Sequence, residues 1–123
     1  ARSPEYIIET VSRDSFPGYF AAFEREPNKV FTPDNYLVQL NAMLNHNIAK
    51  NFNDSLKEAA KRVKAKVLII VGEKDHLVHP RPAIEFAKYI DAELVILENN
   101  CGHLAPGCEL ERTSKLIANF FNK

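Results

Sequence analysis

The stretch that decides the fold is KVLIIVGEKDHLVHP, which spans residues 66–80. From Lys66 to Val71 it is almost wholly aliphatic and largely β-branched, and the run ends at Gly72. Such a run is typical of a strand that is buried on both faces of a parallel sheet. The polar residues that follow would form the loop at the carboxyl end of that strand, where ligands and catalytic groups gather in doubly wound sheets.

Downstream of this strand the pattern alternates between helix and strand. We expect an amphipathic helix from Pro80 to Ile90, a short apolar strand from Glu93 to Leu97 and a closing helix from Glu109 to Phe121. The closing helix would bury one stripe, made of Leu110, Ile117, Phe120 and Phe121. The order strand, helix, strand, helix predicts an α/β fold with two parallel strands joined by a right-handed crossover.

In the first half of the chain the sequence predicts only helices and loops. Ser3-Pro4 begins a helix that would run to about Arg13, and a shorter helix would run from Gly18 to Arg25. Thr32-Pro33-Asp34 combines a capping hydroxyl, a proline and an acid, which is the signal of a helix start. A last helical or 3₁₀ segment would cover residues 55–62. The helix after Thr32 carries an apolar stripe that would join a core or cover a substrate, made of Tyr36, Leu37, Leu40, Met43 and Leu44.

Two strands cannot form a self-sufficient sheet, because a strand buried on both faces needs neighbours at both edges and cover on both faces. The chain begins at Ala1 without an initiating Met, so we expect it to be a piece of a longer protein. The missing strands would come from the N-terminal part of the parent chain or from a homo-oligomeric partner that covers the sheet edge.

Two polar segments follow the two expected strands. Asp75 lies in the loop after the first strand, and His103 lies in the segment 99–103 after the second. Parallel strands bring their carboxyl ends to one edge of a sheet, so we expect these two side chains to meet. An Asp that accepts the Nδ1 proton of a His fixes the tautomer of the ring and stabilises its cation. Gly102 would allow the tight turn that presents the ring.

Taken together, VLIIVGEKDHLVHP and the later CGH motif resemble the last part of the α/β-hydrolase fold. The resemblance implies a catalytic triad in which the acid follows the seventh strand and the histidine follows the eighth, in the chain order nucleophile, acid, histidine. Matched position by position, Asp75 corresponds to the triad acid and His103 to the triad base.

The upstream segment FTPDNYLVQLNAMLNHNIAK, residues 31–50, is similar to the lid helix of homoserine O-acetyltransferases and their relatives. This resemblance implies a helical lid or cap over residues 1–52 and the C-terminal strand-helix-strand-helix portion of the hydrolase core over residues 53–123. Those acetyltransferases tend to have a Gly-His-Asp-x-Phe-like run, whereas residues 102–107 read GHLAPG. The acyl acceptor, and the choice between transfer and hydrolysis, therefore stay open.

The chain has no recognisable nucleophile, because none of its 4 glycines frames a G-x-S-x-G elbow. The resemblance therefore implies a parent enzyme, a serine-type O-acyltransferase or hydrolase, whose nucleophile and oxyanion hole lie outside this chain. The fragment alone would be inactive. Its substrates would be a small-molecule acyl donor, acetyl-coenzyme A or another, and an acceptor. Such chemistry needs no metal or redox cofactor.

Other interpretations of the same residues stay open. In the first, Asp75 forms hydrogen bonds within its own turn, and Glu73 is the acid that pairs with the histidine. His76 and His79, with His103 and the two cysteines, suggest a zinc site, but no C-x-x-C or H-x-x-x-H spacing supports one. A non-catalytic module would use the hydrolase scaffold for binding or assembly through its sheet edge. A basic cluster is expected to be a solvated helix face or, alternatively, a site for the phosphates of an acyl-coenzyme A donor. It consists of Lys57, Lys61, Arg62, Lys64 and Lys66.

Composition narrows the class of protein. The chain has 16 basic and 16 acidic residues, so it has no overall charge to hold nucleic acid or an anionic membrane. An apolar run such as Val67 to Val71 is far too short to cross a bilayer. Two cysteines make no disulfide framework in a chain of this size, so Cys101 and Cys108 are expected to be reduced, unreactive thiols of a cytoplasmic protein.

Overall fold

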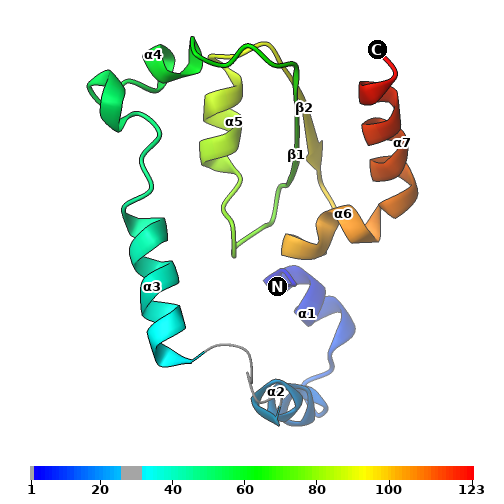
Figure 1. Ribbon diagram of the computed structural model, residues 1–123. Coiled ribbons are helices and arrows are strands. Elements are labelled where there is room, and N and C mark those ends of the chain that lie inside the picture. The colour runs from blue at the N-terminus through cyan, green and yellow to red at the C-terminus, as the bar shows by residue number, and fades with distance from the viewer. Residues whose placement is uncertain (1, 26–31) are drawn as a thin grey trace.

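The computed structural model describes residues 2–25 and 32–123. Within these residues the chain is a mixed α/β structure, with helices around a two-stranded parallel sheet (Figure 1). The strands are β1 (Val67–Gly72) and β2 (Ala92–Leu97). The helices are α1 (Pro4–Thr10), α2 (Phe16–Arg25), α3 (Pro33–Leu44), α4 (Leu56–Ala60), α5 (Arg81–Ala87), α6 (Ala105–Cys108) and α7 (Leu110–Phe121), with 3₁₀ segments η1 (Lys50–Phe52) and η2 (Gly102–Leu104).

The two strands pair in parallel, in register from Val67 opposite Ala92 to Gly72 opposite Leu97. This confirms the parallel arrangement that the order of elements predicts, with α5 as the crossover between the strands. Figure 1 shows α5 on one side of the strands and α7 on the other. The carboxyl ends of both strands therefore open onto the same edge of the sheet.

The strands are less buried than their sequences predict. Residues 67–71 of β1 are half-buried rather than buried on both faces, and Leu94 and Ile96 of β2 are exposed. Within the described residues the sheet holds these two strands alone, so each strand has one paired edge. The apolar side chains therefore lack the neighbours that a strand of this composition has in a complete parallel sheet.

One group of buried residues lies around α4, at Ala49, Ala59 and Ala60, and another lies at the carboxyl end of the sheet. Leu97 and Ala105 are fully buried, and α6 packs against β1. The closing helix α7 contributes little to this core, because its buried residue is Thr113. The expected apolar stripe of α7 is wrong as a buried face, since three of its members are exposed: Leu110, Ile117 and Phe121. The loops after β1 and β2 therefore meet at a well-covered part of the chain.

Two predicted helix caps are confirmed. Oγ of Ser3 accepts the N–H of Tyr6 at the start of α1, and Oγ1 of Thr32 accepts the N–H of Asn35 at the start of α3. Each hydroxyl satisfies a backbone donor that has no partner within its helix. α1 is shorter than expected and ends at Thr10.

α2 differs from expectation in where it begins, and α3 differs in how far it is buried. α2 begins at Phe16, two residues early, because Pro17 is tolerated in a first turn where its missing N–H would have no partner. Every residue of α3 is exposed, and Met43 and Leu44 are 69% and 73% exposed, so its apolar stripe joins no core within the described residues. No helix in residues 2–25 and 32–123 is long and apolar enough to span a bilayer.

Two short helical segments that the pattern does not predict, η2 and α6, lie between β2 and α7. They reverse the chain and bring the Cα atoms of Cys101 and Cys108 to 6.5 Å, and the two cysteines form a disulfide. The expectation of two reduced thiols is therefore wrong. It followed from compartment and cysteine number, whereas this pairing comes from a local chain reversal that brings the Cα atoms within the disulfide range of about 4.4–6.8 Å.

Gly72, the last residue of β1, packs closely against the segment that follows β2. A Cβ at this position would lie 2.8 Å from the carbonyl oxygen of Gly102 and 2.9 Å from Cβ of Ala105. Gly102 has a φ of 60°, in the left-handed region that glycine adopts without strain. The two glycines therefore allow the loop after β1 to contact the loop after β2.

We expect Gly72→Ala to lower the free energy of unfolding by about 1–3 kcal/mol, the usual cost of forcing volume into a packed site. Denaturant titration of the full-length protein measures this loss. Gly107→Ala is the matched control, because a Cβ at Gly107 would meet no atom within 4 Å. Equal stability of the two variants would contradict the close contact between the loops.

Candidate functional site

The loops after β1 and β2 bring Asp75 and His103 together. The N–H of Glu73 donates to the carbonyl of Leu97 at 2.9 Å, so strand pairing continues into the first residue of the loop. Just beyond it, Nδ1 of His103 lies 2.9 Å from Oδ2 of Asp75. The two residues are 28 apart in sequence, and they meet at the edge of the sheet, where the pattern of strands predicts.

Asp75 is held by its own turn as well as by His103. Its Oδ1 accepts the N–H of Leu77 and the N–H of Val78, each at 2.9 Å. Its own N–H donates to the carbonyl of Gly72 at 3.2 Å. The alternative interpretation, an acid bonded to its own turn, therefore describes one carboxylate oxygen, while the other faces the imidazole. The turn fixes the direction in which Oδ2 points.

Asp75 is a partly buried carboxylate. Its side chain is 12% exposed. Burial raises the pKa of this carboxyl, but hydrogen bonds from Val78 N–H, the His103 ring and Leu77 N–H outweigh burial and hold the pKa below its ordinary value. A carboxylate only accepts hydrogen bonds, so Nδ1 of His103 carries the proton of this bond, which leaves Nε2 as the ring nitrogen that can act as an acceptor.

The lowered pKa of Asp75 makes the stability of the fold depend on pH in acid. Its contribution is complete above the ordinary Asp pKa of about 3.9 and is lost as the pH falls through the lower folded value. We therefore expect the difference in unfolding free energy between wild type and Asp75→Asn to shrink below about pH 4. Denaturant titrations of both proteins across this range measure it. A difference that stays constant there would contradict an ionised, hydrogen-bonded Asp75.

The second ring nitrogen of His103, Nε2, is available for a further hydrogen bond. The side chain is 40% exposed, and Nε2 makes no hydrogen bond to any described residue. The ring borders a hollow of about 230 Å³ that Val71, Pro80 and Pro106 also line. In this arrangement the imidazole can accept a proton from a group placed in the hollow, which is what a general base requires.

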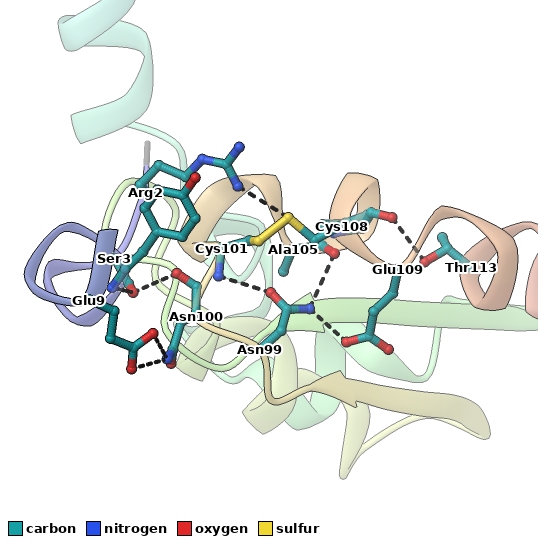
Figure 2. Close-up of a disulfide and its surroundings, with 12 residues drawn as sticks. Arg2, Ser3, Glu9, Asn99, Asn100, Cys101, Ala105, Cys108, Glu109 and Thr113 are labelled. Carbon is teal, nitrogen blue, oxygen red and sulfur yellow. Dashed lines mark hydrogen bonds between the residues drawn. A yellow bond between two sulfur atoms is a disulfide. The ribbon is translucent and has the colours of Figure 1, made fainter. Parts of the chain in front are cut away.

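Asn99 ties together the ends of the segment that carries His103 (Figure 2). Its Oδ1 accepts the N–H of Cys101 at 2.9 Å. Its Nδ2 donates to the carbonyl of Ala105 at 3.3 Å and to Oε1 of Glu109 at 2.6 Å. The bond from Asn99 is the main cause that holds the pKa of Glu109 below its ordinary value. One side chain thus connects η2, α6 and the start of α7.

Asn100 joins the same segment to two other parts of the chain. Its Oδ1 accepts from Nζ of Lys74 at 2.6 Å, in the loop after β1. Its Nδ2 donates to the two carboxylate oxygens of Glu9 in α1 at 2.8 and 3.0 Å. Its carbonyl accepts the hydroxyl of the fully buried Ser3 at 2.6 Å. These bonds dock α1 on the segment that carries His103.

The disulfide lies on this segment too, as Figure 2 shows. It joins Cys101, directly before the Gly-His motif, to Cys108 at the end of α6, and Nη1 of Arg2 donates to Sγ of Cys108 at 3.1 Å. The sequence pattern does not single out Asn99, Asn100 or the disulfide. The sequence does hold a signal for them, which is a pair of asparagines one residue after the end of the second strand, followed by two cysteines 7 residues apart.

Two of the remaining candidates, His79 and Lys61, have partners of their own. His103 pairs with Asp75 rather than with Glu73, and Nδ1 of His79 accepts a backbone N–H two residues later. Lys61 of the basic cluster forms an ion pair with an acid of α4. In the part of the chain that the structure describes, no group of three or more His, Cys, Asp or Glu side chains is placed to hold a metal ion.

Comparison of the chain with protein-family models, with curated proteins and with solved structures gave no match. Its function is therefore inferred from the geometry of the site and the resemblance of its motifs.

Proposed function

We propose that this chain is part of a serine-type acyl-transfer enzyme of the α/β-hydrolase fold, in which Asp75 and His103 are the acid and the base of a catalytic triad. The observation that carries the proposal is the hydrogen bond of 2.9 Å between Nδ1 and Oδ2. This bond joins the carboxylate of Asp75 to His103, whose Nε2 has no hydrogen-bond partner among the described residues. It also lies at the carboxyl ends of two adjacent parallel strands, where catalytic groups of such sheets gather.

In the proposed reaction, a serine hydroxyl in the hollow beside His103 attacks the carbonyl carbon of an acyl donor. Nε2 takes the serine proton as the new C–O bond forms, and Asp75 stabilises the imidazolium. The imidazolium then gives this proton to the leaving group, and an acyl-serine remains. An alcohol or water attacks the acyl-serine in the same way, with His103 again as the base.

The serine is proposed to come from outside these 123 residues. Among the described residues, no serine hydroxyl is hydrogen-bonded to His103. The fully buried Ser3 is already bonded to Tyr6 and Asn100. A G-x-S-x-G elbow on a further strand of the same sheet would place its serine beside the loops that follow β1 and β2.

The exposed apolar surfaces support a larger protein. Each strand has one edge without a partner in the described residues, and the apolar stripe of α3 is exposed. A complete hydrolase core would pair further strands with an open edge of this sheet, and its lid would cover apolar surface with α3. We propose the N-terminal part of the parent chain as the source of these strands. A second copy is the alternative, and the mass of the full-length protein in solution distinguishes the two.

The specific activity proposed is acyl transfer of the homoserine O-acetyltransferase type, because residues 31–50 resemble the lid helix of those enzymes. A coenzyme A thioester would be the acyl donor, as a substrate. Hydrolysis is the second form of the same proposal, because the run GHLAPG departs from the acetyltransferase pattern directly after the histidine. Water would then take the place of the alcohol.

An assay of the full-length protein tests the proposal. The protein is given acetyl-coenzyme A with and without homoserine, and separately a simple aryl acetate, and the released thiol or phenol is measured. Thiol release that requires homoserine supports transfer, and ester cleavage without an acceptor supports the hydrolase form. A folded full-length protein that turns over none of these substrates would contradict the proposal and favour a non-catalytic module.

A further inference from the structure

We propose that the disulfide between Cys101 and Cys108 is a redox-sensitive positioning element for His103, so that its reduction by a dithiol releases the imidazole from Asp75. The effect on activity rests on the proposed function. The structural part, in which the contact between the two side chains depends on the disulfide, is independent of any reaction and is testable by itself.

The disulfide closes the segment in which His103 lies. Its two cysteines are 7 residues apart, with His103 between them. The N–H of Leu104 donates to the carbonyl of Cys101 at 3.1 Å, which closes the turn around the histidine. The direction of the imidazole therefore depends on where the backbone of Cys101 is held, and the disulfide holds it against the end of α6.

Hydrogen bonds hold the same segment and do not depend on the disulfide. Asn99 joins the N–H of Cys101 to the carbonyl of Ala105, and Asn100 joins the segment to Lys74 and Glu9. These bonds involve no sulfur atom, so reduction loosens the segment without removing its other attachments. Because these hydrogen bonds stay in place when the disulfide opens, the segment can return to its original position when the disulfide forms again. The change in the position of His103 would therefore be reversible.

The difference in exposure between the two cysteines sets which sulfur the dithiol attacks first. Cys101 is 8% exposed, whereas Cys108 is exposed and lies beside the guanidinium of Arg2. A thiolate of the dithiol attacks Sγ of Cys108 and forms a mixed disulfide, and the Cys101 sulfur leaves as a thiolate that takes up a proton. The second thiol of the reagent then displaces the Cys108 thiolate, which Arg2 stabilises. The reagent loses two electrons and becomes a disulfide.

NMR of the full-length protein with ¹⁵N-labelled histidine tests the structural part. An Nδ1 proton bonded to a carboxylate resonates far downfield of other imidazole protons, and its loss in His103→Ala assigns it. We expect this resonance in the oxidised protein, its loss or a large shift after dithiothreitol, and its return on reoxidation. The variant Cys101→Ser/Cys108→Ser is the matched control, because it should match the reduced protein with or without dithiothreitol.

Kinetics test the effect on the reaction. We expect complete reduction to lower kcat by about 10- to 100-fold with little change in KM, because displacing a catalytic group by about 1 Å costs rate rather than binding. Reoxidation should restore kcat. The double serine variant should stay slow under both conditions.

Two results separate this inference from the proposed function. An unchanged Nδ1 resonance and an unchanged kcat after complete reduction, verified by thiol titration, would overturn the inference and leave the proposed function standing. Full turnover by His103→Ala would instead remove the proposed function, and the resonance would still decide whether the disulfide holds the ring of His103.

Discussion

Replacing His103 by Ala in the full-length protein is expected to lower kcat/KM by about 10³-fold or more. The open Nε2 of this ring is the proton acceptor for the nucleophile, and alanine offers no group in its place. We expect most of the loss in kcat, because the ring accepts the proton in the transition state and is not proposed to bind the substrate in its ground state. Turnover of both proteins with the same substrate gives the ratio.

The matched control for this substitution is His76→Ala. His76 is an exposed histidine of the loop after β1, directly after Asp75, so the same atoms are removed close to the site without touching the pair. We expect its turnover to stay near that of wild type. A His103→Ala protein that remains within about tenfold of wild type would contradict the assignment, since triad losses usually cost far more.

Replacing Asp75 by Asn is expected to lower kcat by about 10³- to 10⁴-fold. The amide oxygen is able to take over Oδ1 and keep the bonds from Leu77 and Val78, so the turn is preserved. The amide nitrogen then faces Nδ1 of His103 as a donor and favours the tautomer with its proton on Nε2. That ring no longer accepts a proton from the nucleophile, and its cation has lost its carboxylate.

Glu73→Gln is the matched control for Asp75→Asn, because Glu73 is the other acid that the sequence offers in this loop. It makes the same change of acid to amide two residues earlier, on a side chain that does not pair with His103. We expect Glu73→Gln to keep its activity. If Glu73→Gln lost activity and Asp75→Asn kept it, the acid of the site would have been assigned to the wrong residue.

The parts of the site that follow from local patterns could be predicted from the sequence. A run of β-branched residues ending at Gly72 predicts the end of β1, and a short apolar run ending at Leu97 predicts the end of β2. Asp75 and His103 were therefore expected at one edge of the sheet. Caps such as Ser3 and Thr32 were predictable for the same reason, since each depends on atoms within a few residues.

Features that depend on distant or irregular chain could not be predicted in this way. The disulfide requires the reversal through η2 and α6, which no periodic pattern marks. The hydrogen bonds of Asn100 to Ser3 and Glu9 join residues 97 and 91 positions apart. The burial expected for β1 and α7 depends on neighbours that the described residues do not supply, so composition alone overstated it.

The most direct test of the central claim is covalent labelling of the full-length protein with a serine-reactive phosphonate, followed by mass spectrometry of its peptides. We expect one labelled serine, in a G-x-S-x-G segment outside these 123 residues. We also expect its labelling to become far slower in His103→Ala and in Asp75→Asn. The absence of any labelled serine, or equally fast labelling in these variants, would contradict the claim that Asp75 and His103 activate a serine nucleophile.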